Sequence, residues 1–231
     1  MKTKQNKPPA IVTPYFIGCD IVSLINADNI KSYSNEKYIN KILNQSELMY
    51  YNKSENKQVI PPLFWSCKES VYKILLQSGL KSSFSPRSVN VEINEFEALT
   101  GSHGFSVESL TSFENQIFFC RSVVEKDFIF TYACNERQAL NNIIFHLEKV
   151  QYTTTENICT STYNSLLYNI SQQYKIDYSR LSIKKNEDGE PFIYYNESVL
   201  NIPFSVSHDE NFISFAFSAI YFASFLKDVN C

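Results

Sequence analysis

The charged residues best suited to chemistry lie between Leu63 and Gly79, where Lys68, Glu69 and Lys73 interrupt an apolar pattern. In a helix, Glu69 and Lys73 stand one turn apart, and Lys68 projects between two apolar edges. An ammonium group in apolar surroundings is unfavourable unless an anion meets it. The two lysines are therefore candidates for holding an anionic substrate. The alternative is a Glu-to-Lys surface pair worth roughly 0.2–0.5 kcal/mol, which leaves Lys68 unexplained.

Asp20 is a second polar residue inside an apolar segment, the run at residues 15–22 that is predicted to be a buried strand. A carboxylate in such a strand needs a cation, a metal ion or a hydrogen-bonded cap. In the simplest alternative, Asp20 only caps or turns the end of the strand. Because Asp20 and Glu69 come from different elements, they can share a hard cation. Mg²⁺ binds one or two carboxylates together with water and phosphate oxygens.

The third polar group is the segment Ser205-Val-Ser-His-Asp209, a predicted turn between two strands, with Gly189-Glu-Pro191 upstream. His208 at a strand end can donate to a phosphate, or it only caps its own turn. Lysines beside a bound cation suit a pyrophosphate ligand. The sequence has no P-loop and no GxGxxG motif, so an ordinary nucleotide-binding fold is not indicated.

The elements that carry these residues follow from hydrophobic periodicity. Residues 63–79 are predicted to form a helix whose core stripe consists of Phe64, Cys67, Val71, Ile74 and Leu75. Residues 28–60 are polar and partly helical, residues 97–115 are an irregular insertion, and residues 141–150 are a short helix. A second long helix is predicted at 158–174, and strands at 89–93, 117–121, 128–134, 181–183, 192–195, 202–206 and 212–219.

The predicted order of helix, strand and strand–turn–strand occurs after residue 63 and again after residue 157. Repetition of this kind is typical of two related units. We therefore predict an α+β fold of two similar modules, residues 11–150 and residues 151–231, that form a pseudo-dimer. A binding site is expected at the junction of the modules.

Composition limits the classes of function. The chain has 231 residues, 44% hydrophobic content and a net charge of −3, which favour a globular protein and give no sign of nucleic-acid binding. No long apolar run or signal-peptide pattern occurs, so we expect a cytoplasmic protein without membrane contact. The six cysteines lack CxxC spacing and are predicted to be buried thiols, neither a disulfide framework nor a zinc site. His103 and His146 are predicted to be structural.

Four segments resemble the signature motifs of 4′-phosphopantetheinyl transferases. They are Gly18-Cys-Asp-Ile21, Trp65-Ser-Cys-Lys-Glu-Ser-Val-Tyr-Lys73, Gly189-Glu-Pro191 and Phe204-Ser-Val-Ser-His208. The W-x-x-K-E-S-x-x-K element is the most specific, and the resemblance covers most of the chain. The motif order resembles the small holo-acyl-carrier-protein synthases, whereas the length resembles the larger, two-module type that activates surfactin synthetase.

The resemblance implies a role for each motif residue. Asp20 and Glu69 are expected to bind Mg²⁺ together with the pyrophosphate of coenzyme A, and Glu69, or water held by it, is the candidate base. Lys68 and Lys73 are expected to contact phosphates or to help proton transfer. The residues expected to hold coenzyme A are Ser207, His208, Gly189 and Pro191.

Three positions depart from the pattern of the larger type. Val22 replaces a second acid, so water is expected to complete the shell of the metal. Glu190 replaces the lysine of a G-K-P motif and is expected to repel a nearby phosphate. The helix that begins near Ile158 also lacks an arginine that the larger type often carries.

The expected activity is Mg²⁺-dependent transfer of 4′-phosphopantetheine from coenzyme A to a serine of an acyl or peptidyl carrier protein. The carrier protein and coenzyme A are the expected partners. One chain is expected to complete one site as a monomer, with a homotrimer as the alternative. The rival interpretation is a non-catalytic module that binds coenzyme A or a carrier protein. Val22 and Glu190 slightly favour the rival, whereas the joint presence of Asp20, Glu69 and Lys73 favours the enzyme.

Overall fold

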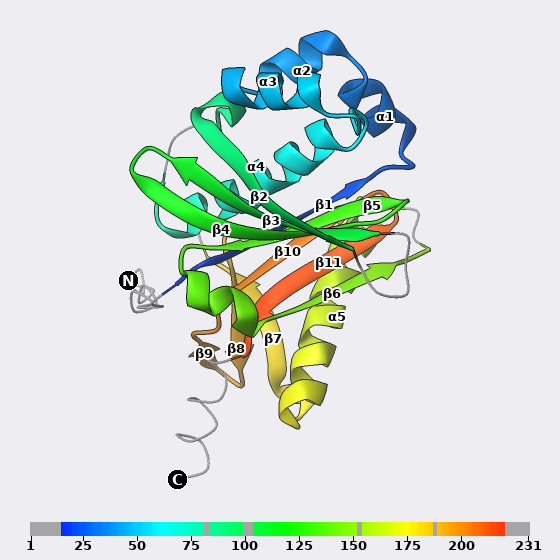
Figure 1. Cartoon of the computed structure of the whole chain (residues 1–231). Helices are drawn as coiled ribbons and strands as arrows, with labels where there is room; N and C mark the ends of the chain where they lie inside the picture. Colours follow the sequence, from blue (N-terminus) through cyan, green and yellow to red (C-terminus); the bar gives the residue numbers. More distant parts are fainter. Residues whose placement is uncertain (1–14, 81–83, 99–103, 152–153, 187–188, 220–231) are drawn as a thin grey trace, which may run out of the picture.

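The computed structural model describes residues 15–80, 84–98, 104–151, 154–186 and 189–219, and these fold into an α+β protein, as the sequence predicts (Figure 1). The helices are α1 (Ala27–Tyr33), α2 (Glu36–Ile42), α3 (Gln45–Lys53), α4 (Ile60–Gln77) and α5 (Thr155–Tyr174). The strands are β1 (Ile17–Ser23), β2 (Val89–Ala98), β3 (Phe105–Phe113), β4 (Gln116–Val124), β5 (Phe128–Cys134), β6 (Ile143–Lys149), β7 (Leu181–Lys185), β8 (Pro191–Tyr195), β9 (Ser198–Leu200), β10 (Phe204–Asp209) and β11 (Phe212–Ser218).

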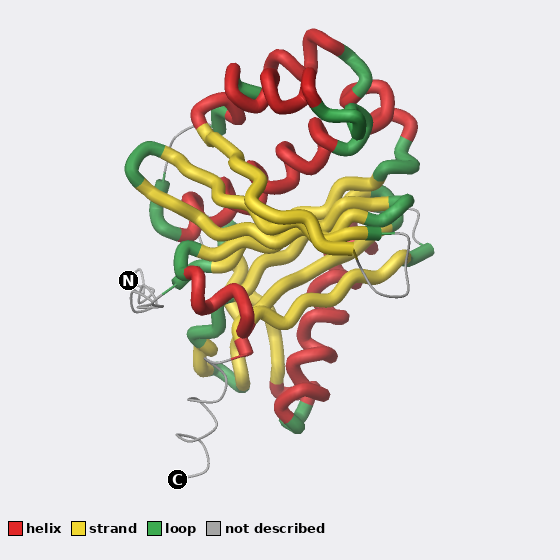
Figure 2. Tube along the Cα trace, viewed as in Figure 1, coloured by secondary structure: helices red, strands yellow, loops and turns green. Residues whose placement is uncertain are grey.

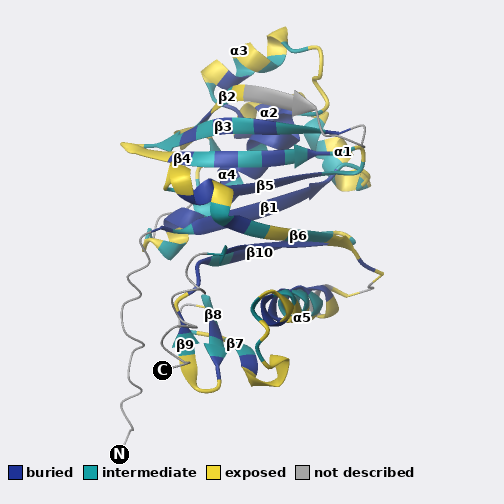
Figure 3. Cartoon of the chain, turned by 60° about the horizontal axis from the view of Figure 1, so that its bottom comes forward, coloured by how far each residue is buried: buried dark blue, intermediate teal, exposed yellow. Residues whose placement is uncertain are grey.

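The described strands form three antiparallel sheets. The first has the strand order β1-β5-β4-β3-β2, the second β10-β11-β6, and the third β7-β8-β9. Helices α1 to α4 cover one side of the first sheet, and α5 lies at the opposite end of the molecule beside the second and third sheets (Figures 1 and 2). Figure 3 shows that strands β1, β5 and β10 lie in the middle, between these two helical parts, and β1 and β5 are the buried ones.

Helix α4 packs its predicted apolar stripe against the first sheet, and all five residues of the stripe are buried. The helix begins at Ile60, before the predicted start at Leu63. Pro61 and Pro62 fit into its first turn, where backbone N–H groups have no intrahelical partner. Its end is correctly predicted, because Gly79 adopts a φ of +94° just after the last helical residues.

Gly18 allows α4 to approach β1 closely. A Cβ atom at Gly18 would lie 1.8 Å from the backbone oxygen of Ser70. Two small residues of α4 use this short distance. Ser66 Oγ donates to the carbonyl of Asp20 at 3.3 Å. Ser70 Oγ donates to Ser66 O at 2.8 Å and lies 3.2 Å from the carbonyl of Thr131 in β5. The glycine therefore sets the spacing between the helix and the strand that carries Asp20.

Gly18→Ala is expected to destabilise the fold by about 3 kcal/mol, the upper part of the usual range for overpacking, because the methyl group pushes α4 away from β1. Gly79→Ala is the matched control. A Cβ atom there has nothing within 4 Å, so only the positive φ opposes the change, at about 1 kcal/mol. Urea unfolding measures both variants, and wild-type stability of Gly18→Ala would contradict the close approach.

The first and second sheets meet where β1 and β10 lie side by side (Figures 1 and 3). Side-chain oxygens of β10 accept the backbone N–H groups of β1 at this contact, which we call the β1–β10 seam. The three hydrogen bonds run from Cys19 N to Ser205 Oγ (3.0 Å), from Ile21 N to Ser207 Oγ (3.4 Å) and from Ser23 N to Asp209 Oδ2 (2.7 Å). Every second side chain of β10 from Ser205 to Asp209 therefore contacts the backbone of β1.

Two sequence predictions about local structure are wrong. The supposed irregular insertion at 97–115 contains the end of β2 and all of β3, although residues 99–103 lie outside the described part of the chain. The buried positions of β3 include Ser109 and Thr111, so polar residues hide the alternation. The supposed helix at 141–150 is mostly strand β6, which is held in an extended form by pairing with β11.

The predicted boundary at residue 150 does not separate the sheets. Strand β6 precedes the boundary, yet it pairs with β11, for example Lys149 with Phe212. The division into modules of 11–150 and 151–231, and their relation as a pseudo-dimer, remain predictions.

Several smaller predictions concern cysteines and histidines. The five cysteines in the described residues are free thiols, four of them buried and Cys159 half-buried, as predicted. Cys231 and His103 lie outside the described residues. His146 stacks on Phe215 with ring centroids 5.2 Å apart, which fits a structural role. None of the described helices is long and apolar enough to cross a membrane.

Candidate active site

Asp20 lies in the middle of β1, so it neither caps nor turns the end of the strand. The residue is only 8% exposed. Its Oδ1 accepts a hydrogen bond from Ser207 Oγ at 3.0 Å and lies 3.4 Å from Lys73 Nζ. Burial raises the pKa of Asp20, while the charge of Lys73 and the hydrogen bond from Ser207 oppose that rise. Three elements, β1, α4 and β10, therefore meet at this carboxylate.

Glu69 projects from α4 one turn before Lys73 and is half-buried. Burial, and then the charge of Asp20, raise the pKa of Glu69 to about 7, whereas Lys73 acts in the opposite direction. The charge of Asp20 thus opposes the ionisation of Glu69. The alternative of a Glu69–Lys73 surface pair is not observed, because the ion pair that Lys73 makes within the described structure is with Asp20.

Lys73 connects the helix to both strands of the β1–β10 seam. Besides its ion pair with Asp20, its Nζ donates to the carbonyl of Cys19 at 2.7 Å and lies 3.4 Å from the carbonyl of Val206. The side chain remains 28% exposed, so the ammonium group is accessible from solvent. Two of its three contacts are long, at 3.4 Å, and can be exchanged for an anionic ligand that approaches from solvent, which the short contacts of a fully buried lysine do not allow.

Lys68 does not belong to this group, and the prediction that it faces a ligand at the rim is wrong. Its fully buried Nζ donates to Glu47 Oε2 at 2.6 Å and to the carbonyls of Ile42 and Pro86, each at 2.8 Å. The anion that the lysine requires is therefore Glu47 of α3, whose Oε1 also accepts the N–H of Val91 at 2.8 Å. Since an ammonium group has three donors, Lys68 has none left for a phosphate.

Ser207 and His208 face opposite sides of β10, because successive side chains of a strand alternate. Ser207 is buried and contacts Asp20. His208 is half-buried and faces α5, where its Nε2 lies 3.2 Å from Cys159 Sγ. Burial, and then the charge of Lys73, lower the pKa of His208, so its ring is neutral at pH 7. His208 lies within β10, so it does not cap a turn as the alternative supposed.

The segment 189–191 lies at the start of β8, in the third sheet at the end of the molecule away from α1 to α3 (Figure 1). The carboxylate of Glu190 accepts from Asn186 Nδ2 at 2.7 Å, and the Glu190 N–H donates to Asn186 Oδ1 at 2.8 Å. Within the described part of the chain, no hydrogen bond or ion pair joins Gly189, Glu190 or Pro191 to the site at Asp20. A coenzyme A contact for Gly189 and Pro191 therefore remains a prediction.

Two tyrosines that the sequence did not single out lie beside the carboxylates. The rings of Tyr33 and Tyr38 have centroids 5.7 Å apart in an edge-to-face arrangement. Burial is the main cause that raises the pKa of each phenol, and the charge of Glu69 adds to it in both cases. The sequence signal for these two tyrosines is their aromatic character within the polar stretch 28–60.

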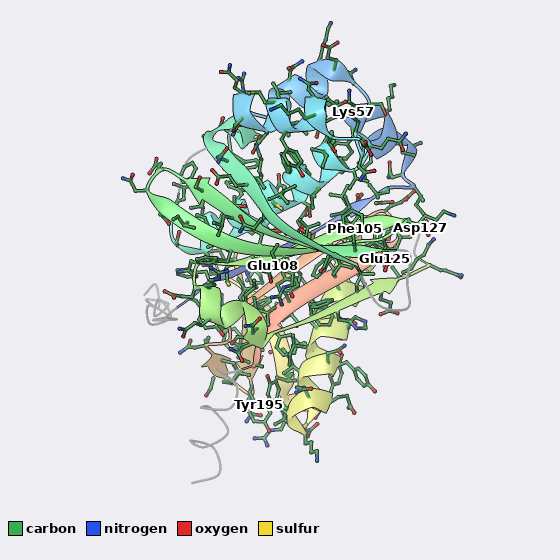
Figure 4. All side chains as sticks on the ribbon, in the orientation of Figure 1. Lys57, Phe105, Glu108, Glu125, Asp127 and Tyr195 are labelled. Atoms are coloured by element: carbon green, nitrogen blue, oxygen red, sulfur yellow. The ribbon has the colours of Figure 1, made fainter. Side chains whose placement is uncertain are left out.

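A cavity of about 620 Å³ adjoins Tyr33. Figure 4 shows Lys57 in the helical layer and Phe105 and Glu125 at the end of the sheet, and all three line the cavity from these different parts. Its lining mixes apolar side chains with the ammonium groups of Lys57 and Lys126. Such a lining suits an extended and partly apolar ligand.

The residues at the seam fit a divalent cation. Within the described structure, no hydrogen bond or ion pair reaches Asp20 Oδ2 or the Glu69 carboxylate, and no buried side-chain oxygen is left without a partner, so these oxygens are accessible. No cluster of three or more histidine, cysteine or acidic ligands occurs among the described residues. A protein contribution of two carboxylates, completed by water and phosphate, is what Mg²⁺ prefers.

Two carboxylates and a lysine near the junction of two sheets are groups that can hold a divalent cation together with a phosphate ester. The chain belongs to the 4′-phosphopantetheinyl transferase superfamily, whose family model matches residues 16–133. This match confirms the resemblance seen in the motifs. It includes Asp20, Glu69 and Lys73, whereas Gly189, Ser207 and His208 lie beyond it. Searches of curated proteins and of solved structures found no match.

Proposed function

We propose that this protein transfers 4′-phosphopantetheine from coenzyme A to a serine of an acyl or peptidyl carrier protein in a Mg²⁺-dependent reaction. The observation that carries the proposal is the pair Asp20 and Glu69 beside Lys73, inside the segment that the family model matches. A substrate with a pyrophosphate group requires concentrated positive charge, which a chain of net charge −3 must supply locally.

Each residue of the site has a defined task in this proposal. Asp20 Oδ2 and the Glu69 carboxylate would hold Mg²⁺, and the bound cation would neutralise the charge of the pyrophosphate. Glu69, or a water molecule bound to it, is the candidate base that accepts the proton of the serine hydroxyl. Lys73 stabilises the negative charge that leaves with 3′,5′-ADP.

The rest of coenzyme A is expected to extend to both sides of the pyrophosphate. His208, whose neutral ring is half-buried beside α5, is the best-supported contact for the nucleotide end, and the family resemblance adds Ser207, Gly189 and Pro191. The cavity shares Tyr33 with the surroundings of the carboxylates, whose charges add to the effect of burial in raising the pKa of this tyrosine, and we assign it to the pantetheine arm. Lys68 has no task in catalysis, because all its donors are used inside the protein.

The proposal includes a cytoplasmic enzyme whose partners are coenzyme A and a carrier protein. A monomer is proposed, because one chain carries every motif and the β1–β10 seam joins Asp20 to β10 of the same chain. Light scattering after gel filtration tests this point. A homotrimer, the alternative state, would contradict it.

Mg²⁺ affinity is expected to rise with pH up to about 7 and then to level off. The Glu69 carboxyl must lose its proton to bind the cation, and in the folded protein its pKa is about 7. Below that pH the affinity changes by about tenfold per pH unit, because one proton is released per ion bound. Calorimetric titration with Mg²⁺ at several pH values from about 5.5 to about 8, which bracket this pKa, measures the effect.

Glu69→Gln is the control for this titration, because glutamine keeps the shape but has no proton to lose near pH 7. The variant is expected to bind Mg²⁺ weakly and with a flatter pH dependence. Without metal, the stability of the fold changes with pH in the opposite direction to the Mg²⁺ affinity. The pKa of Glu69 is higher in the folded protein than its ordinary value of 4.5, so the free energy of unfolding decreases as pH rises from 4.5 through about 7. A pH-independent Mg²⁺ affinity in the wild type would contradict the role of Glu69.

The rival function, a non-catalytic binding module, is separated by measuring binding and release together. Calorimetry is expected to show coenzyme A binding that is tighter with Mg²⁺ than with a chelator. Incubation with an apo-carrier protein is then expected to release 3′,5′-ADP. Binding without release of 3′,5′-ADP for any carrier would favour the rival, and Val22, which is buried where the larger type carries an acid, would be its structural cause.

A further inference from the structure

Ser207 makes two hydrogen bonds that use its hydroxyl group fully on the protein side. The Oγ donates its single hydrogen to Asp20 Oδ1 at 3.0 Å and accepts the backbone N–H of Ile21 at 3.4 Å. The residue is 7% exposed. Because a hydroxyl has only one hydrogen to donate, Ser207 cannot also donate to a phosphate while it holds Asp20.

The two oxygens of Asp20 are therefore in different situations. Oδ1 accepts the hydrogen bond from Ser207 Oγ and lies 3.4 Å from Lys73 Nζ, so residues of β10 and α4 hold it in place. Oδ2 has no hydrogen bond or ion pair with the described residues and is accessible. A carboxylate held in this way can turn only at the expense of its bond to Ser207, which keeps Oδ2 directed to the open side.

We propose that Ser207 is a positioning residue, which orients the Asp20 carboxylate for a divalent cation, and that it is not a ligand of coenzyme A. This inference rests on the proposed function for the identity of the cation. It reassigns one residue of the S-x-S-H motif: contact with coenzyme A falls to His208, which faces α5 on the other side of β10.

The β1–β10 seam contains a natural control for this role. Ser205 accepts the N–H of Cys19 at 3.0 Å, as Ser207 accepts that of Ile21, and both serines are buried. The partners of Ser205 at Cys19 are the N–H and the thiol, and neither is a ligand that Mg²⁺ prefers. A difference between the two serines in cation binding therefore measures the hydrogen bond to Asp20, apart from the general contribution of the seam to stability.

The experiment compares Ser207→Ala with Ser205→Ala in the full chain, using Mg²⁺ alone as the probe in calorimetric titration. Ser207→Ala is expected to weaken Mg²⁺ binding by about 10–100-fold, the usual effect of losing a group that orients a metal ligand. Ser205→Ala is expected to lose similar stability and to keep its Mg²⁺ affinity. Ser207→Thr, which retains the hydroxyl, is expected to restore binding to within a few-fold of the wild type.

Coenzyme A binding in the presence of a chelator separates the two roles of Ser207. Unchanged affinity in Ser207→Ala supports positioning, whereas lost affinity with normal Mg²⁺ binding would overturn it. Equal loss of Mg²⁺ binding in both alanine variants would also overturn it, because the seam alone would then explain the effect. If Ser207→Ala does not fold, Ser207→Cys keeps the volume with a weaker donor and gives the same comparison.

Failure of the proposed function has a different signature. In that case the wild-type protein neither binds coenzyme A nor transfers phosphopantetheine, whatever the serine variants do. A difference between Ser207→Ala and Ser205→Ala in Mg²⁺ affinity would still support the positioning of Asp20 by Ser207.

Discussion

Asp20→Asn is expected to lower the rate of phosphopantetheine transfer by at least about 10²-fold, the usual effect of removing a group that stabilises charge in the transition state. Asparagine keeps the oxygen that accepts from Ser207, but it removes the negative charge that would hold the cation. Stability is expected to be equal or higher, because burial makes the ionised form of Asp20 unfavourable, as its raised pKa indicates. Steady-state rates at limiting Mg²⁺, together with thermal unfolding, measure both effects.

Glu69→Gln is expected to reduce transfer to a similar degree, since it removes the second carboxylate and the candidate base at once. Glu210→Gln is the matched control for both variants. Glu210 is an exposed acid near the same seam, where it accepts a hydrogen bond from Ser23 Oγ at 3.1 Å, and glutamine preserves an acceptor there. Near-wild-type turnover by Asp20→Asn or Glu69→Gln at limiting Mg²⁺ would contradict the metal assignment.

Lys68→Ala is expected to destabilise the protein by about 3–5 kcal/mol, because it leaves the Glu47 carboxylate buried without its cation. The surviving folded fraction is expected to bind coenzyme A normally, since Lys68 has no free donor for a ligand. Urea unfolding gives the loss of stability, and calorimetry below the transition gives the affinity for coenzyme A.

The exposed Lys53 of α3 supplies the control for this loss, and Lys53→Ala is expected to change stability by no more than about 0.5 kcal/mol. The double variant Lys68→Met with Glu47→Leu is expected to be more stable than Lys68→Ala, because it removes both charges together. A stable Lys68→Ala protein that fails to bind coenzyme A would contradict this assignment and would indicate that Lys68 contacts the ligand.

The strongest periodic elements could be predicted from the sequence. The apolar stripe of α4 and the buried run of β1 fixed both elements, and a lone carboxylate in the middle of β1 pointed to Asp20 as part of a site. Strand β3 could not be found in this way. Its buried Ser109 and Thr111 pack near Cys67 and Cys120, to which they bond at 3.6 and 3.3 Å, so a polar interior hides the strand.

Lys68 shows why part of the site could not be predicted. The sequence correctly required an anion for this lysine, but local spacing does not reveal which anion the fold brings near. The partner, Glu47, comes from α3, and it also completes a capping box with Asn44 and accepts the N–H of Val91. The prediction of a helix in place of β6 was wrong for a similar reason, because pairing with β11, which is distant in sequence, determines the extended form of this strand.

Intact-protein mass spectrometry of apo-carrier proteins tests the central claim most directly. Carriers from fatty acid, polyketide and peptide synthesis are incubated with this protein, coenzyme A and Mg²⁺, beside the Asp20→Asn variant. We expect at least one carrier to gain the mass of one phosphopantetheine group on its serine with the wild type, and none with Asp20→Asn. Unmodified carriers throughout, from a protein that still binds coenzyme A and Mg²⁺, would contradict the transferase function.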